Sequence, residues 1–81
     1  NWIIQVEGHT DNVPISTNEF PSNWELSVAR AIAVARIMID NGIEPNRINV
    51  AGYGEFRPLV ENKNEKNKNK NRRIELKLTQ P

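Results

Sequence analysis

His9 and Asp11 stand two positions apart in the stretch GHTDNVPI, and they are the first side chains of the chain that could do chemistry. A histidine beside a carboxylate can act as a general acid–base pair, and both groups can bind a metal ion. However, no nearby serine, cysteine or threonine carries a known nucleophile signature. His9 is the only histidine, and no cysteine is present to complete a metal site. We therefore expect neither a catalytic group nor a metal ligand here, and no cofactor.

Two other interpretations of this loop stay open. Asp11 and Thr10 can stabilise a turn through hydrogen bonds from their side chains to the backbone. Alternatively, the loop recognises a ligand, and the carboxylate of Asp11 forms an ion pair with it. An enzyme that uses His9 as its base remains as the less favoured alternative.

A second group of polar side chains lies near the start of a predicted helix. Arg30 follows Leu26 by one turn, and its guanidinium either extends into water or binds a carboxylate with two nitrogens. Asn23 opens the helix, where unpaired backbone N–H groups favour anions. If the preceding loop folds back over these turns, Asp11, Asn23 and Arg30 line one pocket. Such a pocket offers a carboxylate and a guanidinium, which suit a zwitterion such as the Cα end of an amino acid.

Basic residues are concentrated in the C-terminal third of the chain, in the segment from Lys63 to Arg73. This segment has no aromatic residue on which a base could stack, and acidic residues dilute its charge. The formal net charge of +1 gives the chain no general attraction to nucleic acid or to a membrane surface. We expect a solvated loop here and no nucleic-acid partner.

The helix that must position Asn23 and Arg30 has clear boundaries. Ser22 can serve as its N-cap, and Glu25 follows three residues later, which is a capping box. The helix is predicted to run to about residue 41 and to end at Gly42. Its apolar residues occupy most of its circumference, so we expect more than one of its faces to be covered.

Three strands are predicted around this helix. Residues 2–7 form a β-rich run, residues 48–53 a second strand, and residues 73–79 a third with clean alternation of apolar and polar side chains. The order strand–helix–strand predicts a βαβ unit with parallel strands. Residues 54–71 are expected to be irregular, because their polar tail has no apolar residue to bury. The side chains of the third strand that are expected to face the core are Ile74, Leu76 and Leu78.

Four stretches of the chain together resemble the OmpA-like peptidoglycan-binding domain, in the version of the MotB-type flagellar stator proteins. They are VEGHTDNVPI, FPSNWELSVARA, GYGEFRPLVEN and NRRIEL, and they occur in the order and with the gaps of that family. The resemblance covers essentially the whole chain, which we interpret as a single domain, residues 1–81. The forms GHTDNVPI and SNWELSVARA point to the MotB branch more than to the outer-membrane lipoprotein or porin branches.

The resemblance implies a binding module that is not an enzyme and that holds the cell wall without a covalent bond. Asp11 and Arg30 match the family's aspartate and helix arginine, which grip the diaminopimelate, or an equivalent diamino acid, of the peptidoglycan stem peptide. By the same resemblance, five other positions belong to the groove or flank its aspartate: Asn23, Leu26, Thr10, Asn12 and Arg72.

The resemblance also implies a fold and a place in the cell. The fold is an α/β (α+β sandwich) class, with a βαβ core, a mixed sheet and a helix packed on one face. The chain matches the family from its second strand onward, so we expect a domain truncated at its N-terminus, which explains a helix with two apolar sides.

The parent protein is expected in the periplasm or cell envelope, anchored in the inner or outer membrane by a segment outside this chain, with a homodimer as one arrangement. An outer-membrane-to-wall tether is the alternative to a stator.

Overall fold

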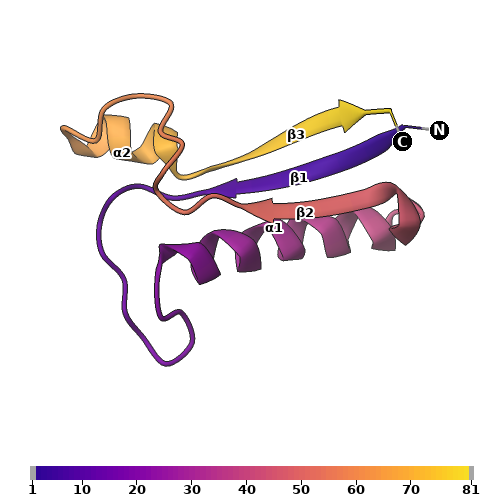
Figure 1. Ribbon diagram of the computed structural model, residues 1–81, viewed down its shortest axis with the longest axis horizontal. Coiled ribbons are helices and arrows are strands. Elements are labelled where there is room, and N and C mark those ends of the chain that lie inside the picture. The colour runs from indigo at the N-terminus through magenta and orange to yellow at the C-terminus, as the bar shows by residue number, and fades with distance from the viewer. Residues whose placement is uncertain (1, 81) are drawn as a thin grey trace.

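The computed structural model describes residues 2–80 as a three-stranded sheet with a long helix along one side (Figure 1). The predicted α/β class, mixed sheet and helix on one face are confirmed. Among the described residues, no helix is long and apolar enough to cross a membrane. The elements in chain order are β1 Ile3–His9, α1 Asn23–Asp40, a short 3₁₀ turn Pro45–Arg47, β2 Ile48–Gly52, α2 Glu65–Asn71 and β3 Arg73–Thr79.

β1 is the central strand of the sheet, whose order is β2-β1-β3. It pairs in parallel with β2, where Val6 lies opposite Val50, as the βαβ prediction requires. On its other edge it pairs antiparallel with β3, where Val6 lies opposite Leu76. The sheet is therefore mixed, and it brings residues from both ends of the chain to the end of β1.

α1 begins and ends where the sequence predicted. Ser22 is the N-cap, and its hydroxyl oxygen accepts a hydrogen bond from the backbone N–H of Trp24 at 3.1 Å. The Ser22 hydroxyl also donates to the carboxylate of Glu25. Gly42, just after the C-cap Asn41, has a φ of 102°, the left-handed conformation that glycine allows.

Small residues let α1 lie very close to the sheet. The buried residues of the helix recur every four positions: Asn23, Ser27, Ala31 and Ala35. A Cβ atom on Gly8 would lie 2.0 Å from the backbone oxygen of Ser27, and one on Gly52 would lie 2.6 Å from the Ser27 hydroxyl. The predicted end of the first strand at residue 7 was wrong: β1 continues to His9, and Gly8 lies within it and allows this close crossing.

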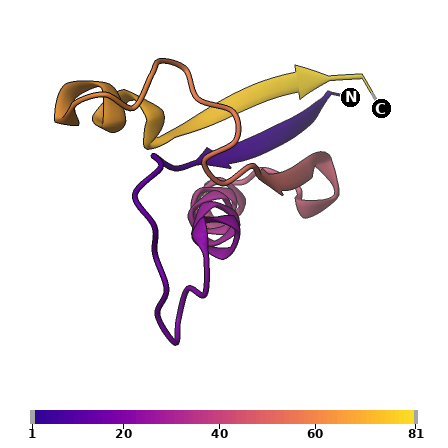
Figure 2. The ribbon, with the colours of Figure 1, turned by 60° about the vertical axis from the view of Figure 1, so that its left-hand side comes forward.

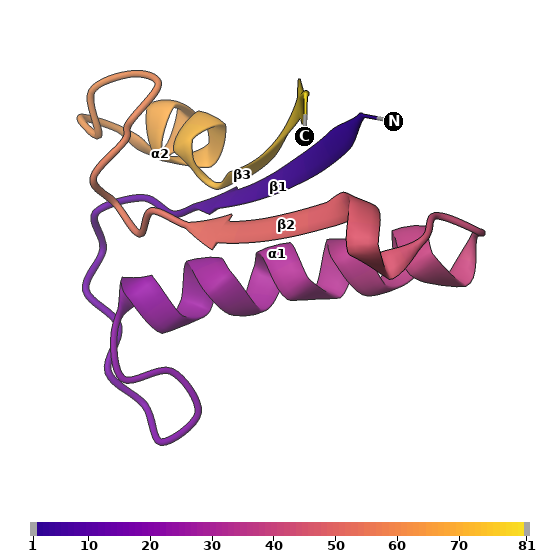
Figure 3. The ribbon, with the colours of Figure 1, turned by 45° about the vertical axis from the view of Figure 1, so that its right-hand side comes forward.

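The core is small and lies between α1 and the β1–β2 half of the sheet (Figure 3). Val6, Ala31 and Ala35 are buried, and five partly buried residues pack against them: Ile4, Val34, Met38, Ile48 and Ile74. Apolar side chains on the other side of α1 are exposed, among them Ile32 and Ile37. The sheet covers one apolar side of the helix, so the expectation that more than one of its faces is covered is not met within residues 2–80.

The inward placement of Leu76 and Leu78 on β3 was a wrong prediction. Both share the sheet face of Val6 and Ile4, yet they are 57% and 63% exposed. The reason is that α1 lies under β1 and β2 and does not extend beneath β3 (Figure 2). Of the three predicted side chains, only Ile74 is packed against the core.

The prediction that residues 54–71 are irregular was wrong at their end, where α2 forms. Its N-cap is Asn64, whose side chain accepts a hydrogen bond from the Asn67 N–H at 2.8 Å. Its last residue, Asn71, is fully buried, and its side-chain oxygen accepts from the N–H groups of Leu59 and Val60 at 2.8 and 3.2 Å. A polar N-cap and one buried amide therefore stabilise this helix. Its sequence has no periodic pattern of apolar residues from which a helix could be predicted.

Candidate ligand-binding groove

A groove of about 290 Å³ opens where β1 ends, between the following loop and the first turns of α1. Six of the seven predicted site residues line it, and the exposed residue Asn12 does not. The apolar loop residues were not predicted, although VPI in the GHTDNVPI stretch was a signal for an apolar wall. The lining residues are Thr10, Asp11, Val13, Pro14, Ile15, Asn23, Leu26, Arg30 and Arg72.

Asp11 is a buried carboxylate with two different partners. Its Oδ1 accepts a hydrogen bond from the backbone N–H of Val13 at 3.0 Å, which closes the turn. Its Oδ2 accepts from Nη1 of Arg72. The Thr10 hydroxyl donates to the backbone oxygen of Asp11 at 2.8 Å. The two interpretations of the loop are therefore compatible, since one oxygen stabilises the turn and the other is engaged in an ion pair.

Asn23 ties the loop to the start of α1. Its side-chain amide donates to the backbone oxygen of Val13 at 3.1 Å and to that of Asp11 at 3.4 Å. From the other side, the Thr10 N–H donates to the backbone oxygen of Gly54 at 2.9 Å. Asp11 thus accepts a hydrogen bond from the helix, and its neighbour Thr10 donates one to the segment after β2.

Arg72 links the groove to α2. Its Nη1 donates to Asp11, and its Nη2 donates to Oε1 of Glu65 at 2.5 Å. These hydrogen bonds, first that to Glu65 and then that to Asp11, raise the pKa of Arg72, so it stays charged. Asp11 and Arg72 are 61 positions apart, and the junction of α2 with β3 brings them together.

Arg30 supplies a second positive charge to the groove. Its side chain is exposed and takes part in no ion pair among residues 2–80. Leu26, one turn earlier, is half-buried and lines the same groove. The groove therefore holds one carboxylate, two guanidinium groups and an apolar wall. This arrangement can receive an ammonium group, a carboxylate and a short aliphatic chain together.

His9 does not join Asp11 in the groove. It ends β1, is only 3% exposed, and stacks on Tyr53 with ring centroids 5.3 Å apart. Burial, and then the positive charge of Arg73, lowers the pKa of His9. The imidazole is therefore neutral at pH 7, and His9 is not among the residues that line the groove, so it does not form a His–Asp pair there.

A second hollow lies beside the first turns of α1 and is mostly apolar. Its only charged lining residues are Glu19 and Glu25, which carry the same sign and cannot match both ends of a zwitterion. Its apolar lining residues are Phe20, Trp24, Val28, Ala29 and Ile32. The groove around Asp11 is the better candidate for a charged ligand.

Comparison with known proteins gives a consistent set of relatives. Motility protein B of Bacillus subtilis is 43% identical over 74 residues, which cover 90% of this chain and 28% of that protein. The peptidoglycan-associated lipoprotein of Pseudomonas aeruginosa is 36% identical over 74 residues, covering 91% of this chain and 42% of that protein. The chain therefore spans less than half the length of these relatives.

A solved structure shows the same fold. The crystal structure of the C-terminal domain of Helicobacter pylori MotB superposes with a TM-score of 0.92 at 32% sequence identity, covering 99% of this chain and 61% of that one. The sequence model of the OmpA family matches residues 1–72. Because that match includes β1, α1, β2, α2 and the groove between them, the chain belongs to the OmpA family.

Proposed function

We propose that this chain binds peptidoglycan without a covalent bond and so holds a cell-envelope protein to the wall. The observation that carries the proposal is the groove in which Asp11, Arg30 and Arg72 present opposite charges beside an apolar wall. A family member of similar sequence is named a peptidoglycan-associated lipoprotein, which fits this assignment.

We further propose that the groove recognises the diamino acid of the stem peptide. Asp11 would receive its ammonium group, and Arg30 its carboxylate. Without a ligand, Arg72 neutralises Asp11, so an incoming ammonium group must share or replace that partner. A zwitterion makes this exchange favourable, because its carboxylate gives the displaced guanidinium a new partner. The aliphatic chain of the diamino acid would lie against Val13 and Leu26.

The parent that we propose is a flagellar motor stator protein located at the inner membrane and acting in the periplasm. Motility protein B of Bacillus subtilis is 43% identical to this chain, and the superposed structure is also a MotB domain. An outer-membrane-to-wall tether is the second candidate, because relatives that are named as outer-membrane proteins also match most of this chain. In either case the membrane anchor would belong to a part of the parent outside this chain.

Binding, and not catalysis, is the function that the geometry supports. The base that a peptidoglycan hydrolase would use, His9, lies outside the groove. The hydroxyl of Thr10 is already engaged with the backbone oxygen of Asp11. A hydrolase would release soluble muropeptides from the wall over time, and we expect none.

Co-sedimentation with purified peptidoglycan tests the proposal. Asp11→Asn and Arg30→Ala should each reduce the bound fraction, with an affinity loss of about tenfold or more, because each removes one charge partner of the ligand. Arg36→Ala is the matched control, since Arg36 is an exposed arginine of the same helix outside the groove. Circular dichroism should stay unchanged in all three. Unaltered binding in both groove variants would refute the proposal.

A further inference from the structure

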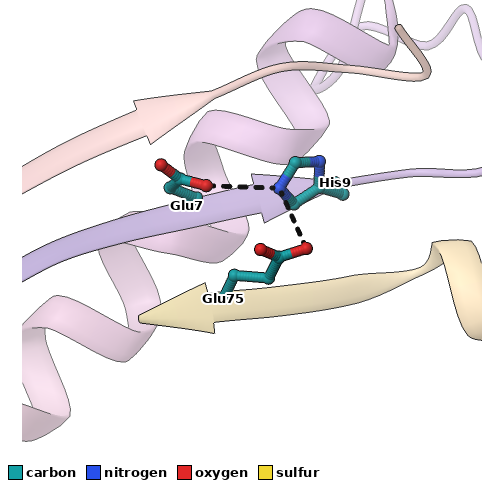
Figure 4. A group of neighbouring side chains, drawn as sticks. All are labelled: Glu7, His9 and Glu75. Carbon is teal, nitrogen blue, oxygen red and sulfur yellow. Dashed lines mark ion pairs between the residues drawn. The ribbon is translucent and has the colours of Figure 1, made fainter. Parts of the chain in front are cut away.

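A cluster of three potential metal ligands lies on the sheet face opposite α1 (Figure 4). Glu7 and His9 are two positions apart on β1, so their side chains point to the same face. Glu75 on β3 lies directly opposite Glu7 in the antiparallel register. The ligand atoms of the three side chains lie within 4.8 Å of one another.

The imidazole of His9 is the unusual member of this cluster. It is 3% exposed, and neither ring nitrogen has a hydrogen-bond partner among residues 2–80. Nε2 faces the two carboxylates, 3.7 Å from Oε1 of Glu7 and 4.0 Å from Oε2 of Glu75. Burying a polar nitrogen without a partner costs free energy, so the fold is expected to supply one.

The geometry around Nε2 favours a cation as that partner. The two groups that face it, Glu7 and Glu75, are acceptors, and at 3.7 and 4.0 Å both lie beyond hydrogen-bond distance of Nε2. One imidazole nitrogen and two carboxylate oxygens that lie within 4.8 Å of one another can together coordinate a cation, which the glutamates attract.

We propose that Glu7, His9 and Glu75 form a binding site for a divalent transition-metal ion of the Zn²⁺ type. One imidazole nitrogen and two carboxylate oxygens are ligands that Zn²⁺ accepts. In a tetrahedral zinc site the ligand atoms are about 3.4 Å apart, given metal–ligand bonds of about 2.1 Å. The observed gaps of 3.7 and 4.0 Å need only small side-chain rotations to close. The fourth position would be left to water.

The surrounding residues orient the two carboxylates. Gln5 donates to Oε2 of Glu7 at 2.7 Å, which leaves Oε1 facing His9. Arg73 donates to Oε2 of Glu75 and also to the backbone oxygens of Asn71 and Arg57, at 3.3 and 3.0 Å. The hydrogen bond from Gln5, outside the ligand set, is of the kind that commonly fixes a metal ligand in place. The Oε2 atom of Glu75 that Arg73 binds is also the oxygen that faces His9, so Arg73 must release it to a metal, and it can do so while keeping its two backbone partners.

Lys77 also competes with a metal at this site. Nζ of Lys77 lies 3.2 Å from Oε1 of Glu7, the oxygen that faces His9. The Lys77 side chain is 57% exposed, so it can move into water when a cation arrives. Removing its charge should therefore tighten metal binding, whereas removing a ligand should weaken it. These opposite effects distinguish a true site from general attraction of cations to carboxylates.

Titration of the untagged, chelator-treated chain with Zn²⁺ tests the site. We expect one ion per chain by calorimetry, binding at least about tenfold weaker in Glu75→Gln and His9→Gln, and binding about tenfold tighter in Lys77→Ala. Glu61→Gln, an exposed carboxylate outside the cluster, is the matched control and should bind as the unaltered chain does. Equal affinity in Glu75→Gln, or no binding by the unaltered chain, would overturn the proposal.

A second readout does not depend on how well the variants fold. Because His9 is the only histidine, its ring-nitrogen NMR signals belong to one residue. Zn²⁺ should shift the Nε2 signal in the unaltered chain, and an unshifted signal at saturation would overturn the proposal. The site is also independent of peptidoglycan binding, since none of its three ligands lines the groove around Asp11.

Discussion

At the scale of single residues, the groove depends on side chains that the sequence places far apart. The motif predicted that Asp11, Asn23 and Arg30 would meet, and these residues do line one groove. The contact between Asp11 and Arg72 could not be predicted, because it depends on where α2 ends and β3 begins. The partners of His9 were missed for the same reason, since Glu75 comes beside it only through the register of β3 with β1.

Asn23 is the residue whose loss should most directly loosen the groove. Asn23→Ala removes the two hydrogen bonds to Val13 and Asp11 and leaves their backbone oxygens without these donors. We expect the free energy of unfolding to fall by about 1–3 kcal/mol, because the amide is buried. Urea denaturation measures this value.

The exposed Asn18, in the loop before α1, offers a control, since Asn18→Ala should change stability by less than about 0.5 kcal/mol. Equal stability of the Asn23 and Asn18 variants would show that the amide of Asn23 does not hold the loop.

At the scale of elements, the sequence predicted those with strong local signals. The capping box at Ser22, the glycine after α1 and the alternation in β3 placed those boundaries within about two residues of the observed ones. α2 was missed because it has no apolar face, and its stability comes from the cap at Asn64 and the distant partners of Asn71. The exposure of Leu78 was missed because strand alternation says which side chains share a face and not whether that face is covered.

The cap of α1 makes a prediction about pH. The hydrogen bond from the Ser22 hydroxyl lowers the pKa of Glu25, so this carboxylate stabilises the fold above the ordinary glutamate pKa. That contribution is lost as the pH falls through the lowered pKa of the folded state. Ser22→Ala should cost about 1 kcal/mol at pH 7, and the difference from the unaltered chain should be smaller at a pH below that pKa.

Thermal unfolding at the two pH values, together with the NMR titration of Glu25, measures these effects. In Ser22→Ala the pKa of Glu25 should rise back toward its ordinary value. A Glu25 pKa that stays the same in the variant would show that the cap does not involve this carboxylate.

The crossing of α1 over the sheet makes a second prediction at this scale. Gly8→Ala would place a methyl group 2.0 Å from the backbone oxygen of Ser27, and backbone cannot move aside as a flexible side chain can. We expect the free energy of unfolding to fall by about 3 kcal/mol or more. Urea denaturation measures this loss, and a loss below about 1 kcal/mol would show that the helix sits farther from β1.

At the scale of the whole molecule, the two faces of the sheet have different roles. One face packs on α1 and positions the groove at the end of β1. The opposite face carries polar side chains, among them the proposed metal ligands Glu7, His9 and Glu75. Alternate residues of β1 therefore serve the two faces, with Val6 in the core and Glu7 and His9 on the opposite face, while the groove residues begin at Thr10, directly after the strand.

The measurement that tests the central claim most directly is an NMR titration of the chain with a soluble muropeptide that carries diaminopimelate. The proposal predicts saturable shifts of the backbone amide signals that are largest around the groove, at Asp11, Val13, Asn23 and Arg30. It also predicts that Arg30→Ala makes these shifts much smaller at the same muropeptide concentration. Shifts that do not saturate, or that are confined to other parts of the molecule such as the apolar hollow at Trp24, would contradict it.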